Sequence, residues 1–151
     1  MRLSFAAALA LTAASSLNAQ SIADLTTTPT VAGEWVYSQA TDGSEAVFKD
    51  ANSNPQLWLH CTRVTRQVTV SRPASAPAST LNIWTSTTQQ SLPASYDAQT
   101  GRVSLSKWAF EPLWDAMAFS RGRIGVAVGS DAPIVVPPWE EVARLVEDCR
   151  V

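Results

Sequence analysis

The sequence has few of the residues that build metal sites and strongly charged surfaces. Its 151 residues include one histidine and two cysteines, too few soft ligands for a zinc site. Eleven Lys and Arg stand against 13 Asp and Glu, so no basic surface attracts nucleic acid or an anionic membrane. Hydrophobic residues make up 46% of the chain, which argues against wholesale disorder. The composition predicts one globular domain with no metal and no other cofactor.

The sequence also has no long apolar run, and a short one lies near the start of the chain. Met1-Arg2 carries a positive charge, residues 5–12 are apolar or small, and small residues lead to Ala19. This pattern predicts a signal peptide at residues 1–19; the alternative is an N-terminal core helix. Residues 20–33, rich in Thr, Ser and Ala, would follow as a flexible lead-in. We therefore expect a periplasmic or secreted protein with no membrane span after cleavage.

The two cysteines, Cys61 and Cys149, lie far apart in the sequence. In an oxidising compartment an isolated pair most simply forms one disulfide. The alternative is two buried free thiols. A redox-active pair is disfavoured because there is no CxxC motif. The sequence therefore predicts one structural disulfide.

Alternating apolar and polar residues predict a single β-rich domain over residues 34–151. Leu57, Leu59 and Cys61 alternate onto one face of an expected strand, and Asp42-Gly43 indicates a hairpin turn earlier in the chain. The expected fold is mainly β, a small antiparallel β-sandwich or partly closed barrel with a C-terminal α-helix.

The C-terminal helix is predicted by a single apolar stripe. Val142, Leu145, Val146 and Cys149 occupy positions i, i+3, i+4 and i+7. Pro138 suits the first helical position. A disulfide from Cys149 would therefore join this helix to the strand that holds the other cysteine.

Residues 116–128 resemble one strand whose alternation changes phase. Met117 and Phe119 are odd-numbered, whereas the apolar residues of the second half are even-numbered. A slip of one residue centred on Gly122 predicts a β-bulge, which glycine tolerates. Residues 111–116, just before it, could form a single helical turn.

His60 is the one imidazole available for catalysis. A nucleophilic triad would combine it with a serine and a carboxylate, for which Ser120 and Asp115 are the nearest candidates. The sequence has no G-x-S-x-G motif. The favoured interpretation is a histidine on a half-exposed strand face beside Trp58, and no catalytic residue is assigned.

Arg121 and Arg123 form the most suggestive polar pair, on either side of a glycine. Two guanidinium groups at such a place could hold a carboxylate, a phosphate or an acidic loop of a partner. The alternative, which we favour, is salt bridging to the acidic helix, through Glu140 or Glu147.

Six tryptophans are the most unusual feature of the composition. An exposed Trp stacks on sugar rings or anchors a protein interface, whereas a buried Trp belongs to the core. Trp58 and Trp84 lie opposite the apolar positions of their strands. They are therefore the candidates for an exposed or ligand-facing aromatic pair.

Two C-terminal segments, DAMAFSRGR at residues 115–123 and PPWEEVARLVEDCR at residues 137–150, resemble a signature of small exported bacterial proteins of uncharacterised function. The resemblance implies a periplasmic setting and names no substrate. More distantly, the chain is similar to periplasmic lysozyme inhibitors and to invasion-associated secreted proteins, which are small, β-rich and disulfide-bonded. The Ser-Gly loop of the lysozyme inhibitors is not found; Ser120-Arg121-Gly122 is its nearest counterpart.

These features predict an exported, non-enzymatic binding or accessory protein of the bacterial envelope, with another protein as its partner. The first alternative is a carbohydrate- or peptidoglycan-binding module that uses Trp58 and Trp84. The second is a small periplasmic hydrolase that uses His60. The oligomeric state stays open.

Overall fold

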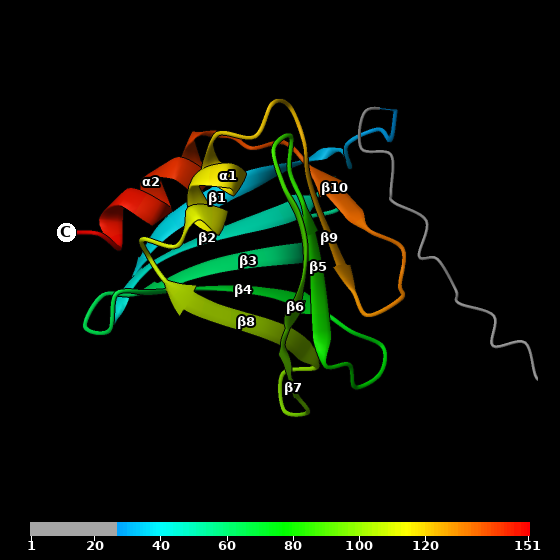
Figure 1. Cartoon of the computed structure of the whole chain (residues 1–151), viewed down its shortest axis with the longest axis horizontal. Helices are drawn as coiled ribbons and strands as arrows, with labels where there is room; N and C mark the ends of the chain where they lie inside the picture. The colour runs from blue at the N-terminus through cyan, green and yellow to red at the C-terminus, as the bar shows by residue number, and fades with distance from the viewer. Residues whose placement is uncertain (1–26) are drawn as a thin grey trace, which may run out of the picture.

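The computed structural model describes residues 27–151, and these form ten β-strands and two α-helices (Figure 1). The helices are α1 (Pro112–Ala118) and α2 (Glu140–Asp148). The strands are β1 (Gly33–Ala40), β2 (Gly43–Asp50), β3 (Pro55–Thr62), β4 (Gln67–Pro73), β5 (Thr80–Trp84), β6 (Gln89–Pro93), β7 (Ser95–Asp97), β8 (Arg102–Trp108), β9 (Ile124–Val128) and β10 (Ile134–Val136).

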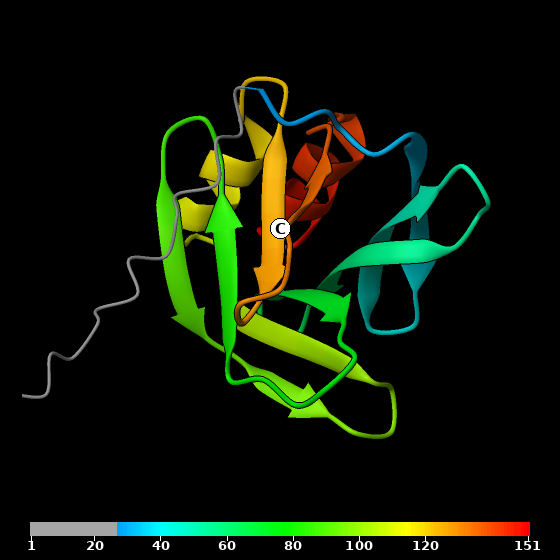
Figure 2. The same ribbon diagram turned by 90° about the vertical axis from the view of Figure 1, so that its right-hand side faces the viewer.

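The strands pair antiparallel into two sheets. The larger sheet has the order β1-β2-β3-β4-β8-β7 and the smaller sheet the order β10-β9-β5-β6. Helix α2 packs on α1 and on β1, β2 and β3, and the smaller sheet lies beside the helices (Figure 1). In the turned view the larger sheet bends around the core, with β1–β3 on one side and β8 below (Figure 2). The mainly β fold with a C-terminal helix is confirmed, and the two sheets do not close into a barrel.

Strand β3 lies inside the larger sheet and carries the alternation that the sequence shows. Leu57, Leu59 and Cys61 are at most 1% exposed. They belong to one apolar cluster that also takes in residues of both helices and of the smaller sheet. The predicted inward face of this strand is confirmed.

The hairpin between β1 and β2 lies where Asp42-Gly43 predicts a turn. Asp42 lies in the turn, and Gly43 is the first residue of β2. A Cβ atom at Gly43 would lie 2.0 Å from the carbonyl oxygen of Cys61 on β3. Glycine is therefore required here because the neighbouring strand passes so close.

The disulfide joins the end of the chain to the centre of the larger sheet. The sulfurs of Cys61 and Cys149 are bonded, and their Cα atoms lie 5.5 Å apart. Val142, Leu145 and Val146 of α2 are at most 1% exposed. The predicted pairing and the predicted helical stripe are thus both confirmed.

Helix α2 begins slightly later than the sequence suggests. Trp139, with an extended backbone (φ −77°, ψ 173°), precedes the first turn. The carbonyl oxygen of Pro137 accepts a hydrogen bond of 2.7 Å from Trp35 Nε1, so the proline segment is held against β1 before the helix starts. Neither α1 nor α2, the helices of residues 27–151, has the length and apolar character to cross a membrane.

The β-bulge predicted at Gly122 is wrong. Helix α1 extends to Ala118, and only residues 124–128 form a strand. Met117 faces the core from the helix at 1% exposure, whereas Phe119, just beyond its end, is 71% exposed. Gly122 has φ +80° and lies in the connecting loop, where glycine readily adopts this conformation. The change of phase marks the passage from a helix to a strand.

The predicted signal peptide at residues 1–19 lies outside the described residues, as does the lead-in up to residue 26. Hydrogen bonds hold the remainder of the lead-in, residues 27–33, against the rest of the domain. The backbone N–H of Val31 donates to Val135 O on β10 at 2.8 Å. The side chain of Arg123 donates from Nε to Thr28 O at 2.8 Å. This part of the lead-in therefore lies against the smaller sheet rather than free of it.

Replacing both cysteines, as Cys61→Ala with Cys149→Ala, is expected to lower the free energy of unfolding by about 4 kcal/mol. The bond spans 88 residues, and its loss frees that loop in the unfolded chain. Denaturant titration of the double variant and of the oxidised parent measures the difference. The reduced parent is the control and should match the variant; equal midpoints for the oxidised and reduced parent would contradict the expectation.

Candidate functional site

The structure does not bring the five predicted binding residues to one place. Trp58 and His60 lie on β3 in the larger sheet, whereas Trp84 ends β5 in the smaller sheet. Arg121 and Arg123 lie in the loop between α1 and β9. A single site that uses all five residues is therefore not formed.

Trp58 lies outside the core cluster, as its place in the alternation predicts, but its predicted exposure is wrong. The side chain is only 8% exposed. The guanidinium carbon of Arg102 lies 3.5 Å from the centre of its ring, and this cation–π contact covers one ring face. That ring face is not available to a sugar.

His60 pairs with carboxylates near the β1–β2 turn. Its Nε2 lies 3.1 Å from the Asp42 carboxylate, and its Nδ1 lies 3.9 Å from Glu45. The hydrogen bond with His60 is the main cause that lowers the pKa of Asp42 below its ordinary value. The structure therefore gives His60 carboxylate partners, but not those that the triad hypothesis named.

The other members of the hypothetical triad lie elsewhere and are engaged. Ser120 Oγ accepts from the backbone N–H of Ser86 and donates to the carbonyl of Arg123. Asp115 pairs with Arg150 at 2.8 Å. Within residues 27–151, no group of three or more His, Cys, Asp or Glu side chains is arranged to hold a metal ion.

The predicted salt bridges of the Arg121–Arg123 loop to α2 are not formed within residues 27–151. Arg123 donates to the lead-in, as described above. The backbone N–H of Arg121 donates to Ser86 Oγ at 2.9 Å, which ties the loop to the β5–β6 hairpin. Glu147 pairs instead with Arg150 at 3.0 Å. Arg123 and the backbone of Arg121 therefore hold neighbouring segments instead of α2.

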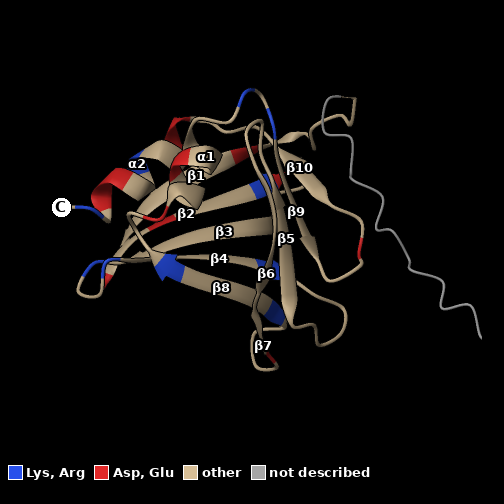
Figure 3. Cartoon of the chain, in the orientation of Figure 1, with Lys and Arg blue, Asp and Glu red and all other residues tan. Residues whose placement is uncertain are grey.

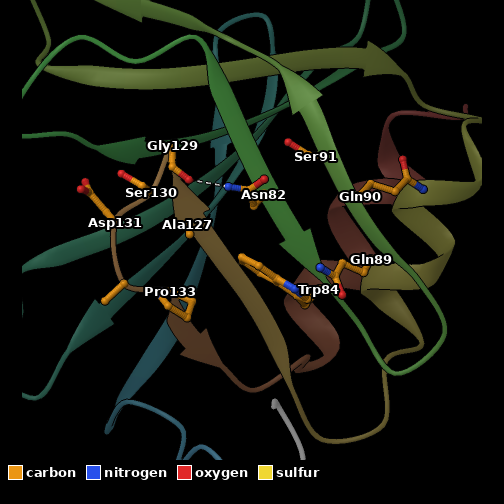
Figure 4. Close-up of a pocket in the computed structure, with 11 residues that line it drawn as sticks. Asn82, Trp84, Gln89, Gln90, Ser91, Ala127, Gly129, Ser130, Asp131 and Pro133 are labelled. Atoms are coloured by element: carbon orange, nitrogen blue, oxygen red, sulfur yellow. Dashed lines mark hydrogen bonds between the residues drawn. The ribbon is translucent and has the colours of Figure 1, made fainter. Parts of the chain in front are cut away.

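Trp84 is the predicted binding residue that lines a pocket. The pocket has a volume of about 350 Å³ and lies on the outer face of the smaller sheet (Figure 4). Trp84 is 9% exposed, so the ring is recessed rather than displayed, and its predicted exposure is wrong. The pocket is lined by Asn82, Trp84, Gln89, Gln90, Ser91, Ala127 and residues 129–133.

Strand register explains why the sheet is hollow at this point. Trp84 lies opposite Gly125, and Asn82 lies opposite Ala127 on β9. These two small residues leave space on the outer face beside the indole. On the other side, β6 places Gln89 opposite Trp84, so one wall is small and apolar and the other is polar (Figure 4).

Two polar groups in the pocket wall have defined hydrogen-bonding states. Asn82 Nδ2 donates to the carbonyl oxygen of Gly129 at 2.6 Å, which orients its amide. The indole Nε1 of Trp84 is buried and has no hydrogen-bond partner in the described part of the chain. Buried donors without a partner are rare in folded proteins and call for an explanation.

Arg72 supports the pocket's rim from the larger sheet. Its Nη1 donates to Val126 O at 2.7 Å and to Ala132 O at 3.0 Å. Burial lowers the pKa of the Arg72 guanidinium, and the nearby Asp131 carboxylate opposes that shift. A charged donor beneath the loop thus fixes residues 129–133 relative to β9.

Comparison of the chain with models of protein families, with curated proteins and with solved structures found no match. The chemistry of the pocket is therefore the main indication of function. Sequence reasoning missed β6 and with it Gln89. The signal for the hollow was present in β9, where Gly125 and Ala127 alternate with larger apolar residues.

The Arg72→Met variant is expected to lower the free energy of unfolding by about 2 kcal/mol, because two carbonyls lose a charged donor. Amide exchange should quicken in residues 129–133. Denaturant titration and hydrogen exchange measure the two effects. Arg102→Met is the control: it removes a cation–π contact, worth about 1 kcal/mol, and should leave exchange in this loop unchanged. Unaltered loop exchange in Arg72→Met would contradict the bracing role.

The His60→Gln variant is expected to raise the pKa of Asp42 toward its ordinary value of 3.8. A lowered carboxyl pKa stabilises the fold above the ordinary value, and this contribution is lost as the pH falls through the lowered pKa. The variant should therefore show a weaker loss of stability on acidification. NMR titration of the side-chain carboxyls tests this.

Asp97 provides the internal control for that titration. Its pKa is lowered mainly by the backbone N–H of Gln99, so it should titrate alike in both proteins. An Asp42 pKa that does not change in His60→Gln would show that the His60 hydrogen bond is not formed in solution.

Proposed function

We propose that this domain is a non-enzymatic binding module of an exported bacterial envelope protein, and that its pocket at Trp84 takes a neutral sugar bearing hydroxyl and amide groups. The recessed ring of Trp84, with the amides of Asn82 and Gln89 beside it, carries the proposal. Aromatic rings with nearby polar groups suit sugars, whose faces are apolar and whose edges are polar.

The size and polarity of the pocket support a small, uncharged ligand. Its volume of about 350 Å³ is near the lower end of ligand sites, about 300–1,000 Å³. The amides of Asn82 and Gln89 provide both donors and acceptors. Asp131 is the one charged residue in the lining, which disfavours an anionic group. A residue of an N-acetylated envelope glycan has this chemistry.

The pocket's residues support binding rather than cleavage of a glycan. Glycoside hydrolysis ordinarily uses two carboxyl groups on either side of the scissile bond. Asp131 is the single carboxylate in the lining. His60, the candidate of the hydrolase alternative, lies on the larger sheet.

The disulfide supports the proposed periplasmic or secreted location. Structural disulfides persist in oxidising compartments and are rare in a reducing cytosol. The bond between Cys61 and Cys149 is fully buried, as expected for a structural link.

The Trp84→Phe variant is expected to bind N-acetylhexosamine oligosaccharides about tenfold more weakly than the parent, because a phenyl ring offers a sugar less stacking area than an indole does. Calorimetric titration measures the affinity. Trp108→Phe is the control, since Trp108 is 55% exposed and lies outside the pocket. No binding by the parent, or equal binding by Trp84→Phe, would overturn the proposal.

A further inference from the structure

The first strand of the larger sheet, β1, is a long edge, and within residues 27–151 it pairs on one side only, with β2. β1 has eight residues, whereas the opposite edge β7 has three. In the smaller sheet, β10 also has three residues and accepts a hydrogen bond from Val31, and β6 ends at a proline. Edge strands are usually protected by shortness, Lys, Pro, bulges or cover. β1 contains no Lys, Arg or Pro and pairs with β2 without a register shift.

The free edge of β1 has backbone groups available for another strand. Within residues 27–151, the backbone hydrogen bonds outside the strand ladders include none to residues 33–40. Such an edge can add an extended peptide as a further strand, with the main chain providing affinity and alternate side chains providing specificity.

A hollow beside this edge would receive the side chains of an added strand. It has a volume of about 530 Å³ and lies between β1 and the first turns of α2. Its lining includes the consecutive residues Trp35, Val36 and Tyr37. Since neighbours on a strand point to opposite faces, a hollow that touches all three reaches the edge itself.

The α2 wall of the hollow carries Glu140, Glu141 and Arg144, and neither glutamate forms a salt bridge within residues 27–151. Glu140 and Glu141 line it, and Glu141 Oε2 is buried without a hydrogen-bond partner in the described part of the chain. Arg144 lies 3.9 Å above the ring of Tyr37 and forms no salt bridge with either glutamate within residues 27–151. Figure 3 shows acidic residues near both ends of α2.

We propose that the edge of β1 and this hollow bind an extended peptide segment of a partner protein, through β-strand addition and a Lys or Arg side chain placed at Glu141. A second copy of this chain fits less well. Its own β1 offers Trp35 and Tyr37 on the face toward α2 and no basic residue, so Glu141 would stay without a counter-charge. The proposal concerns another surface than the Trp84 pocket and does not depend on it.

The probes are short synthetic peptides that alternate Thr and Val around one central Lys, with matched peptides that carry Ala or Glu. The Lys peptide is expected to bind about tenfold more tightly than the Ala peptide, as one charge-assisted hydrogen bond predicts. In Glu141→Gln the Lys and Ala peptides should bind alike. Fluorescence anisotropy with labelled peptides measures both affinities.

Glu147→Gln is the matched control, because it removes the same charge from the same helix outside the hollow and should keep the preference for Lys. Hydrogen exchange locates the peptide: amides of β1 should gain protection, and those of β6, an edge strand of the smaller sheet, should not. The proposal is overturned if no peptide binds, if protection appears elsewhere, or if Glu141→Gln keeps the Lys preference. A dimer that protects β1 without peptide would also overturn it, in favour of self-association.

Discussion

The bond between Cys61 and Cys149 sets the position of the last helix, and much of the surface follows from it. The bond fixes the end of α2 to the centre of the larger sheet. At the other end of the helix, Trp35 holds Pro137, so α2 is anchored to β3 at one end and to β1 at the other. This double attachment keeps Glu141 beside the edge of β1 while the apolar stripe of the helix stays in the core.

Local sequence patterns predicted the strands and helices in which the spacing of the apolar residues fits only one kind of element. The alternation of Leu57, Leu59 and Cys61 and the stripe ending at Cys149 each match one period, and the structure confirms both. The prediction of one bulged strand over residues 116–128 was wrong because Met117 and Phe119 are spaced by two, as in a strand. In the structure they lie at the end of a short helix, which finishes at Ala118. A pattern this short fits either period, and the choice is made by packing against α2.

The candidate site was less predictable, because alternation indicates a face and not what covers it. Trp58 is covered by Arg102, which arrives from β8 through a pairing that the sequence does not reveal. Trp84 is recessed for a different reason: Gly125 becomes its neighbour only through the register of β9 on β5. Both tryptophans lie on the predicted side of their strands, and their environments depend on strand order.

Ion pairs are distributed unevenly along α2, and this determines which carboxylates lie beside the edge of β1. Arg150 pairs with Glu147 and Asp115 near the end of the helix, whereas Glu140 and Glu141 lie in the first turn. Carboxylates at a helix N-terminus are stabilised by the helix dipole. The helix dipole therefore offsets part of the cost of leaving these carboxylates without a salt bridge within residues 27–151, beside the edge where the proposed basic side chain would lie.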